Sequence, residues 1–501
     1  MTTQQDNPVV TAPPDPAARL AGGPAGIAAV HRMLAVALAA TSSGDRARGG
    51  PGPSGGPETV DAAMTAVLST GLPRHGVGAD AALSQICAAF AAGSVNPAHP
   101  LCAAHLHAPP LAVAAAADIA AGLLNASMDS WDQAPSASTL ERLVTAALAG
   151  LVYPRTRAPD ALITTGGTES NLVALLLGRE RAGARLQLIC GANAHHSLPR
   201  AAWMLGLPPA VIVPTGSDGL LRPEHVARAV AATGGPMVVA ATAGTTDHGG
   251  LDPVPELAAV AAEHGAFFHV DAAYGGGLLF SDQRRHLLAG LDRADTVALD
   301  MHKFGWQPLA AGILAVRDAA WLTPLSITAD YLNADDDVEA GLPPLLGRSI
   351  RTSRRADALK LAVTFHALGR TGLGALVDRC CDLATAFAAA VDGRPTFRLH
   401  RTPTLSTVVF RPAAADRLDP ATGNALVAEV RRRLLHEGTA VIGRATVPGP
   451  APGAPEDCWL KVTLLNPEAG AADLEALLDL VEHATDRAAA DLGDRHPAKE
   501  A

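Results

Sequence analysis

The chain has 501 residues, of which 48% are hydrophobic and 18% are charged, a balance typical of a folded globular protein and not of a disordered one. Its formal net charge is −10 and no cluster of lysine or arginine falls in its central part, so the composition argues against nucleic-acid binding. The length allows two or three domains.

Cysteine usage and the N-terminus indicate the compartment. The six cysteines have neither CxxC spacing nor a framework pattern, which favours free thiols in a reducing cytoplasm. The N-terminus has no basic segment followed by an apolar run, as a secretory signal has. Residues 27–40 are apolar, but His31 and Arg32 interrupt them and the stretch is too short to span a bilayer. We therefore expect a cytoplasmic protein.

Residues 1–105 predict a tail followed by a helical segment. Residues 1–26 are rich in proline and polar residues, and the Gly/Pro-rich residues 44–57 predict a loop. His105 and His107 are two residues apart and suit metal ligation, but no third ligand has a suitable spacing nearby, so we predict no metal site. Helices are expected at 27–40, 60–69 and 81–92.

Residues 106–370 show short apolar runs that alternate with helical patterns. Uninterrupted apolar strands separated by helices predict a mostly parallel sheet covered by helices on both faces, so the fold class is α/β. The expected strands are 161–164, 186–190, 210–213, 237–241, 267–270, 296–299 and 312–316.

The pattern changes after about residue 370 and predicts a smaller α+β domain over 371–490. The Pro/Gly-rich residues 448–455 predict a surface loop, and residues 491–501 a polar tail. Strands are expected at 405–410, 440–442 and 460–465, and helices at 373–391, 421–436 and 472–484.

Polar groups follow several of these strands, where ligands of an open parallel sheet collect. The sequence TTGGTESN, residues 164–171, lies between a strand and a helix. Its glycines allow close backbone approach, the helix N-terminus favours an anion, and Thr168 adds a hydroxyl, so the segment suits a phosphate. It is not GxGxxG and lacks the lysine of nucleoside-triphosphate loops. The alternative is an ordinary capped turn.

Three further strand ends carry groups that suit one cofactor. His195 could stack on a ring and exchange protons near neutral pH, whereas we interpret His196 as a surface residue. Asp271 leaves an apolar strand and suits a salt bridge to a protonated pyridine nitrogen. Lys303 follows the strand at 296–299, where desolvation lowers the pKa of an amine and makes it nucleophilic towards an aldehyde. Pyridoxal phosphate (PLP) needs all of these groups.

The motif His-Val-Asp-Ala-Ala-Tyr at 269–274 and the pair His302-Lys303 resemble the group II PLP-dependent amino-acid decarboxylases. These are relatives of the aromatic-amino-acid and glutamate decarboxylases with the aspartate aminotransferase (type I) fold, and the resemblance covers roughly residues 97–467. It implies that Lys303 carries the cofactor, that Asp271 pairs with its ring nitrogen and that His195 stacks on the ring. It also implies that Gly167, Thr168 and His302 surround the phosphate, that Thr246 lies beside the ring and that Ala273 packs on its face.

The chain departs from the family pattern at three places. Phe304 follows the lysine where tryptophan is frequent, and Asp300 stands where some members have a phosphate-binding asparagine, so that role is not transferred. The tyrosine on the mobile loop of aromatic decarboxylases has no secure counterpart. The proton donor is therefore open between Tyr331 and His195.

Several stretches resemble most the bacterial branch that acts on diamino acids, namely the L-2,4-diaminobutyrate decarboxylases and the lysine decarboxylases of siderophore pathways. They are residues 128–133, 329–333, 352–360 and 463–467. The resemblance implies a homodimeric enzyme that converts L-2,4-diaminobutyrate or L-lysine to a diamine and CO2. The acidic run Asp335–Asp337 either attracts the second ammonium or is a solvated loop. The alternatives are an aromatic-amino-acid decarboxylase and a catalytically silent PLP-fold binding protein.

Overall fold

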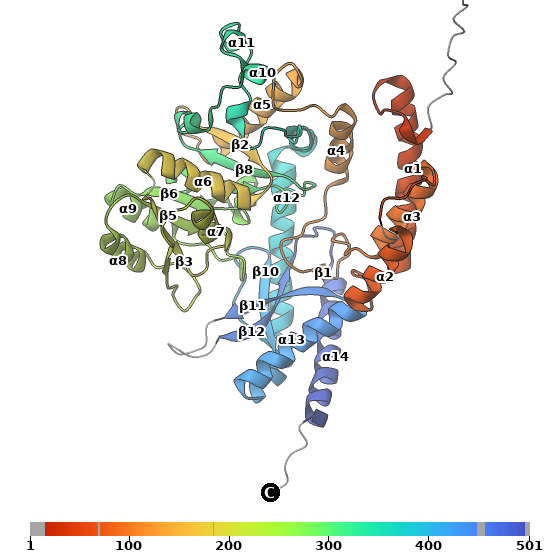
Figure 1. Cartoon of the computed structure of the whole chain (residues 1–501). Coiled ribbons are helices and arrows are strands. Elements are labelled where there is room, and N and C mark those ends of the chain that lie inside the picture. The colour runs from red at the N-terminus through yellow and green to blue at the C-terminus, as the bar shows by residue number, and fades with distance from the viewer. Residues whose placement is uncertain (1–15, 69–70, 184, 448–455, 496–501) are drawn as a thin grey trace, which may run out of the picture. The chain divides into compact units, whose positions relative to one another are not determined.

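The computed structural model describes residues 16–68, 71–183, 185–447 and 456–495 (Figure 1). The predicted loop at 448–455 and the outer parts of both predicted tails lie outside the described residues. The chain divides into two compact units, one of residues 1–49 and 53–95 and the other of residues 50–52 and 96–501. Residues 96–105, which the sequence groups with the N-terminal helices, thus belong to the second unit.

The first unit is built from α1 (Gly23–Arg48), α2 (Gly56–Leu68) and α3 (Ala79–Ala92). Helix α1 packs closely on α3 at Gly44. A Cβ atom there would lie 2.2 Å from the Ala88 carbonyl oxygen, so the approach of the two helices requires glycine. At its end Arg48 donates to the Ala91 carbonyl at 2.6 Å, and Gly49 terminates the helix in the left-handed region.

Three expectations for this segment are wrong. The helix expected at 27–40 runs on to Arg48, because contacts with α3 override the weak propensity of its glycine-containing end, and α2 begins inside the expected loop 44–57. Helix α1 is also not too short to span a bilayer. Among the described residues it is the one helix long and apolar enough to do so, by length and composition alone.

The second unit contains a seven-stranded sheet of order β2-β8-β7-β6-β5-β3-β4. Strand β8 is antiparallel to both β2 and β7, and the remaining pairs are parallel, which confirms the predicted α/β class. The strands are β2 (Asp160–Thr164), β3 (Gln187–Gly191), β4 (Val211–Val213), β5 (Met237–Thr242), β6 (Phe267–Asp271), β7 (Thr296–Asp300) and β8 (Gly312–Val316).

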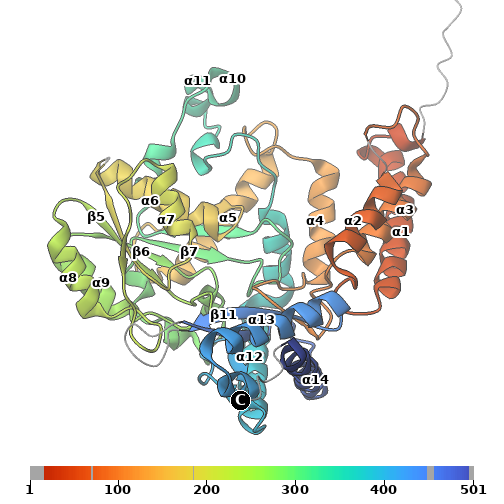
Figure 2. The ribbon, with the colours of Figure 1, turned by 60° about the horizontal axis from the view of Figure 1, so that its bottom comes forward.

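Helices cover both faces of this sheet (Figure 2). Leu188 of β3 packs with Leu198 of α7, whereas the next residue, Ile189, packs with Val226 of α8. This alternation explains why the strands are apolar throughout. The helices of this region are α4 (Ala112–Leu124), α5 (Pro135–Val152), α6 (Gly167–Ala182), α7 (Ser197–Met204), α8 (Pro223–Thr233), α9 (Val254–Glu263), α10 (Asp330–Asn333) and α11 (Asp335–Glu339).

The C-terminal part forms a second, five-stranded sheet of order β1-β11-β12-β10-β9. Its first strand, β1 (Cys102–Ala103), comes from before the large sheet and pairs parallel with β11, a pairing too short to predict from sequence. The other strands are β9 (Phe397–Leu399), β10 (Thr407–Pro412), β11 (Val441–Val447) and β12 (Asp457–Thr463), and the helices are α12 (Ala358–Asp392), α13 (Pro420–Glu437) and α14 (Ala471–Arg495).

Two of these helices are longer than expected. Helix α12 starts at Ala358 and contains a non-helical residue, Gly369, at a φ of 62°, so the predicted start at 373 marks only the straight part after the kink. Helix α14 continues to Arg495, and the expected tail therefore begins later than residue 491. Within this core Phe387 of α12 packs with Phe410 of β10.

Candidate active site

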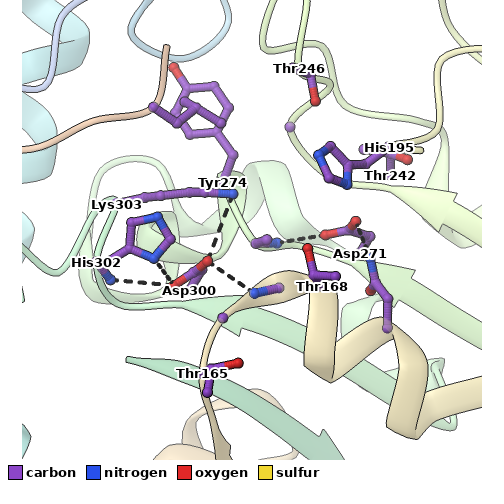
Figure 3. Close-up of a pocket in the computed structure, with 16 residues that line it drawn as sticks. Thr165, Thr168, His195, Thr242, Thr246, Asp271, Tyr274, Asp300, His302 and Lys303 are labelled. Carbon is purple, nitrogen blue, oxygen red and sulfur yellow. Dashed lines mark hydrogen bonds and ion pairs between the residues drawn. The ribbon is translucent and has the colours of Figure 1, made fainter. Parts of the chain in front are cut away.

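One cavity of about 360 Å³ lies where β5, β6 and β7 end and α6 begins (Figure 3). The arrangement follows from the parallel strands, whose carboxyl ends meet at one edge of the sheet. All eight predicted site residues line this cavity: Gly167, Thr168, His195, Thr246, Asp271, Ala273, His302 and Lys303. Residues far apart in the chain are therefore brought together as the sequence predicts.

The first turn of α6 forms a narrow cradle at the cavity wall. A Cβ atom on Gly167 would lie 2.9 Å from Cβ of Ala273, closer than side chains normally approach, so glycine is required there. Glu169 accepts a hydrogen bond from the Thr165 backbone N–H at 2.7 Å and fixes the turn before the helix. The N–H groups of such a helix start, which have no partner within the helix, favour an anion.

Asp271 is 5% exposed, and its carboxylate is held by neutral donors. Its Oδ2 accepts from Asn171 Nδ2 at 2.8 Å, and its Oδ1 from the Ala273 backbone N–H at 3.0 Å. These donors fix the carboxylate without cancelling its charge. A buried negative charge in this state favours a cationic partner, such as a protonated ring nitrogen.

Asn171 connects Asp271 to two histidines. Its amide nitrogen also donates to Ser197 Oγ at 2.9 Å, and that hydroxyl lies 2.8 Å from His195 Nδ1. Its amide oxygen lies 2.9 Å from His269 Nε2, and the other ring nitrogen of His269 lies 2.8 Å from Thr296 Oγ1. The network therefore runs from β7 through β6 and α6 to the cavity.

Burial sets the protonation of both histidines. It lowers the pKa of His195, while the nearby Asp271 carboxylate acts in the opposite direction. Burial lowers the pKa of His269 to about 4, again opposed by Asp271. His269 is fully buried, so the neutral ring serves as a fixed hydrogen-bonding spacer behind Asp271.

Lys303 and Asp300 face each other in the cavity (Figure 3). The lysine Nζ lies 3.9 Å from Asp300 Oδ2, and 16% of the lysine side chain is exposed. Asp300 Oδ2 also accepts from the Gly167 backbone N–H at 3.0 Å, and Asp300 Oδ1 contacts His302 Nδ1. The lysine amine is thus both enclosed and held by an anion.

A side pocket of about 350 Å³ extends the cavity towards the small sheet. It shares His195 and Lys303 with the main cavity and adds Lys461 of β12, His105 and His107. Lys461 Nζ donates to the Thr246 carbonyl at 2.9 Å and lies 3.9 Å from Asp247 Oδ1.

Burial lowers the pKa of Lys461, of His105 and of His107, and it is the largest cause in each case. Lys461 further lowers the pKa of His105, and His302 that of His107, whereas Asp247 raises that of Lys461. Since an ordinary histidine pKa is about 6.5, both imidazoles are neutral at pH 7. To the groups shared with the main cavity the side pocket therefore adds one lysine and two neutral groups able to accept hydrogen bonds.

Tyr274 also lines the main cavity, and its hydroxyl joins the two sheets. It lies 2.8 Å from Ser406 Oγ and 2.9 Å from Thr407 Oγ1, and it accepts from the Ser406 backbone N–H at 3.1 Å. Burial raises the pKa of this phenol, so the hydroxyl stays protonated.

The family described as pyridoxal-dependent decarboxylase conserved domain matches residues 67–413. The chain belongs to the pyridoxal-dependent decarboxylases. It is 38% identical to the L-2,4-diaminobutyrate decarboxylase of Rhizobium meliloti (strain 1021) over 420 residues, covering 82% of this chain and 83% of that protein. It is 31% identical to the L-2,4-diaminobutyrate decarboxylase of Acinetobacter baumannii, covering 68% and 72%.

A solved structure supports the assignment of the chain to this family. The glutamate decarboxylase domain of the diaminobutyrate-pyruvate transaminase and L-2,4-diaminobutyrate decarboxylase of Vibrio parahaemolyticus matches with a TM-score of 0.80 and 28% identity, covering 93% of this chain and 98% of that one. The chain is thus a PLP-dependent amino-acid decarboxylase with the predicted fold.

The residues of this decarboxylase fit PLP. Gly167 leaves space at the helix start for a phosphate, Asp271 presents a buried charge for the ring nitrogen, and Lys303 is the enclosed amine. An ordinary capped turn, the alternative for residues 164–171, would not need glycine at position 167, since the conflict with Ala273 arises only from the close approach of the two segments.

Sequence reasoning missed several residues of the decarboxylase site. Asn171, Ser197 and His269 lie beside predicted residues in the chain, but their function depends on contacts between separate elements. Lys461 lies in a strand of the other sheet and gives no local signal. The sequence gives one indication of this network: His269 lies inside an apolar strand, where a histidine needs polar partners.

Other candidates lie away from the cavity. Tyr331 is 82% exposed on α10, and the acidic run Asp335–Asp337 lies exposed on α11. Asp335 lines a different cavity, together with Arg348. In this structure the acidic run is a solvated helix start, and His195 is the candidate proton donor that reaches the cavity.

Proposed function

We propose that this decarboxylase removes the α-carboxyl group of a diamino acid, with L-2,4-diaminobutyrate as the first candidate and L-lysine as the second. The observation that carries the proposal is the convergence of Lys303, Asp271 and His195 on one cavity in a chain 38% identical to an L-2,4-diaminobutyrate decarboxylase. The aromatic alternative has less support, because Tyr274 is the only phenylalanine, tyrosine or tryptophan among the described residues that line either pocket.

The proposed roles follow from the environment of each residue. Lys303 holds the cofactor, and Asp271 keeps its ring nitrogen protonated. His195 would contact the ring and is the proposed route for the proton that replaces the carboxyl group. When bound, the cofactor supplies the electron sink that loss of CO2 requires. The cradle at Gly167 and Thr168 and the ring of His302 orient the phosphate end, and Thr246 and Ala273 limit the ring's position.

The side pocket supports recognition of both ends of a diamino acid. Lys461 is the one lysine or arginine there besides Lys303 among the described lining residues, and it suits the substrate carboxylate. The neutral rings of His105 and His107 can accept hydrogen bonds from a second ammonium, which a desolvated site must satisfy. The two imidazoles therefore favour an ammonium over an aromatic ring.

A substrate panel tests the proposal. CO2 release and amine formation would be measured with L-2,4-diaminobutyrate, L-ornithine, L-lysine, L-DOPA, L-tryptophan and L-glutamate. One well-placed polar contact supplies about 2–3 kcal/mol, so we expect a preference of roughly 30–150-fold in kcat/KM for the diamino acids. Fastest turnover of an aromatic amino acid would overturn the substrate assignment and leave the chemistry intact. Bound cofactor without any CO2 release would support the silent binding protein instead.

We further propose that the enzyme is a cytoplasmic homodimer in which the first unit packs on a second copy. Its helices expose large apolar side chains, among them Ile27, Leu38 and Phe90, each more than half exposed. Apolar surface of this kind favours association. Light scattering at micromolar concentration and cell fractionation test this proposal; a fully active monomer would contradict it.

A further inference from the structure

The phosphate cradle of this chain already contains an anion. Asp300, the last residue of β7, directs its carboxylate to the start of α6, where its Oδ2 accepts from the Gly167 backbone N–H at 3.0 Å. The side chain is 2% exposed, so the carboxylate is enclosed with that N–H. A Cβ atom on Gly166 would lie 3.5 Å from the same oxygen, which puts Asp300 against both cradle glycines.

The remaining contacts of Asp300 are with groups that also serve the cofactor. Its Oδ2 lies 3.9 Å from Lys303 Nζ, and its Oδ1 contacts His302 Nδ1 and accepts from the His302 backbone N–H at 3.5 Å (Figure 3). The carboxylate is therefore placed as a small phosphate would be, between a helix N-terminus and a lysine. An aspartate cannot share these groups with a phosphate as an asparagine could, because it carries a like charge and has no N–H to donate.

We propose that Asp300 is a built-in competitor of the cofactor phosphate. In the cofactor-free chain it satisfies the Gly167 N–H and holds the Lys303 ammonium, and binding of the phosphate requires the carboxylate to give up the first contact. The second contact is given up when Lys303 engages the cofactor. Asp300 is thus a positioning residue that stabilises the cofactor-free site and weakens the hold on phosphorylated cofactor. This inference rests on the proposed cofactor-binding residues.

The test compares two ligands that differ only in the phosphate. PLP and pyridoxal would each be titrated into cofactor-free wild type and Asp300→Asn, and the ratio of the two dissociation constants gives the contribution of the phosphate. Effects on the ring or on Lys303 act on both ligands and cancel in this ratio. Because two like charges a few ångströms apart in a partly buried site repel strongly, we expect the neutral side chain of Asp300→Asn to raise the phosphate preference about tenfold or more.

Two further variants make the result decisive. Asp300→Ser removes the charge without supplying an amide, and it should raise the phosphate preference in the same direction, which keeps the test open if Asp300→Asn fails to fold. Asp295→Asn is the matched control, because it removes a buried carboxylate just before the opposite end of β7, where it accepts from the Phe268 backbone N–H and pairs with Arg317. We expect its ratio to stay within about twofold of wild type, since its charge is already paired away from the cavity.

The outcomes separate this inference from the proposed site. An unchanged phosphate preference in both Asp300 variants would overturn the competitor role. A lower preference would also overturn it and would identify Asp300 as a residue that helps to hold the phosphate. Wild type that forms no chromophore linked to Lys303 would instead overturn the proposed site. Inorganic phosphate gives a second readout, since it should raise the melting temperature of the cofactor-free variants more than that of wild type.

Discussion

Strands β6 and β7 are neighbours, each has five residues, and each ends in an aspartate that faces the same cavity. Asp271 at the end of β6 is held by the amide of Asn171 and a backbone N–H. Asp300 at the end of β7 accepts from the backbone N–H groups of Gly167 and His302 and faces the side chains of Lys303 and His302. The two carboxylates have the same chemistry and the same kind of position, yet their partners differ in charge.

This difference teaches that the partners decide what a carboxylate at a strand end can do. Neutral donors leave the charge of Asp271 available for a cationic ring, whereas Asp300 is already engaged with a cationic side chain. A strand-end aspartate is therefore not a site residue by position alone. The following predictions test the comparison, from the largest expected effect to the smallest.

The largest effect is expected for the lysine beside Asp300. Lys303→Ala should lose the protein-linked chromophore and nearly all turnover, because it is the one lysine among the described residues that line the main cavity. Borohydride reduction and peptide mapping of wild type should place the pyridoxyl group on Lys303. Lys461→Ala is the matched control, since it should keep the chromophore and chiefly raise KM; labelling of Lys360 or Lys461 would refute the assignment.

Removing the negative charge of Asp271 tests the function of this strand end separately from that of Asp300. Asp271→Asn should still bind some cofactor but lose about 10²-fold or more in kcat, on the order of 3 kcal/mol of transition-state stabilisation. Its preference for PLP over pyridoxal should stay near that of wild type, because the ring end and the phosphate end are held by different strands. A near-normal rate would contradict the role of Asp271.

Asn171 tests whether neutral partners are what distinguishes Asp271. Asn171→Ala removes the amide that holds the carboxylate, and a hydrogen bond to a charged group contributes about 1.5–3 kcal/mol, so kcat should fall roughly 10–150-fold. The pH titration of the bound chromophore should also shift, which a purely structural defect would not cause. An unchanged titration with a lower rate would identify Asn171 as structural only.

We expect the smallest effect for His269, which should make the stability of the fold depend on pH. Its pKa is about 4 in the folded chain and about 6.5 when unfolded. As the pH falls from 6.5 towards 4, His269 becomes protonated in the unfolded chain but stays neutral in the folded chain. The free energy of unfolding therefore falls, by up to about 3 kcal/mol.

Denaturant unfolding at several pH values measures this slope. His269→Gln should lower the dependence of the free energy of unfolding on pH by the equivalent of about one proton taken up on unfolding. Strand β7 has an alanine, Ala298, two residues before its aspartate and makes no such contribution. His248→Gln is the control outside the network, since burial also lowers its pKa to about 4 and its loss should flatten the slope without altering the chromophore. An unaltered slope in His269→Gln would contradict the buried neutral ring.

The sequence predicts the fold class and the strand-end groups His195, Asp271 and Lys303, because a parallel sheet places its strand ends at one edge. Thr246, Ala273 and His302 are predicted only by the resemblance to the family. Asp271 and Lys303 need only that rule and the order of the motifs. Asn171 and His269 could not be predicted as a pair, since their contact joins α6 to β6 across a long stretch of chain. Lys461 was out of reach for the same reason, because β12 belongs to another sheet whose position follows from tertiary packing.

Each error in the helix limits has a specific structural cause. The end of α1 at Arg48 depends on two carbonyls of the α3 region, which the one-dimensional pattern does not contain. Helix α12 continues across the kink at Gly369, whereas the hydropathy pattern predicts a helix only after it. Sequence left two readings of the acidic run at Asp335, because charge alone does not reveal which side of a loop faces the site.

The hydroxyl of Tyr274 limits how far the enzyme can be divided into modules. Its partners Ser406 and Thr407 lie at the start of β10 in the small sheet, so a fragment that stops before these residues would leave this buried phenol without them. Trp306, just after the lysine, likewise donates to the Leu465 carbonyl at 2.8 Å. A chain truncated to the large sheet alone would therefore leave both side chains without these partners, and one of them, Tyr274, lines the cavity. We expect the large sheet not to keep this cavity when the C-terminal part is removed.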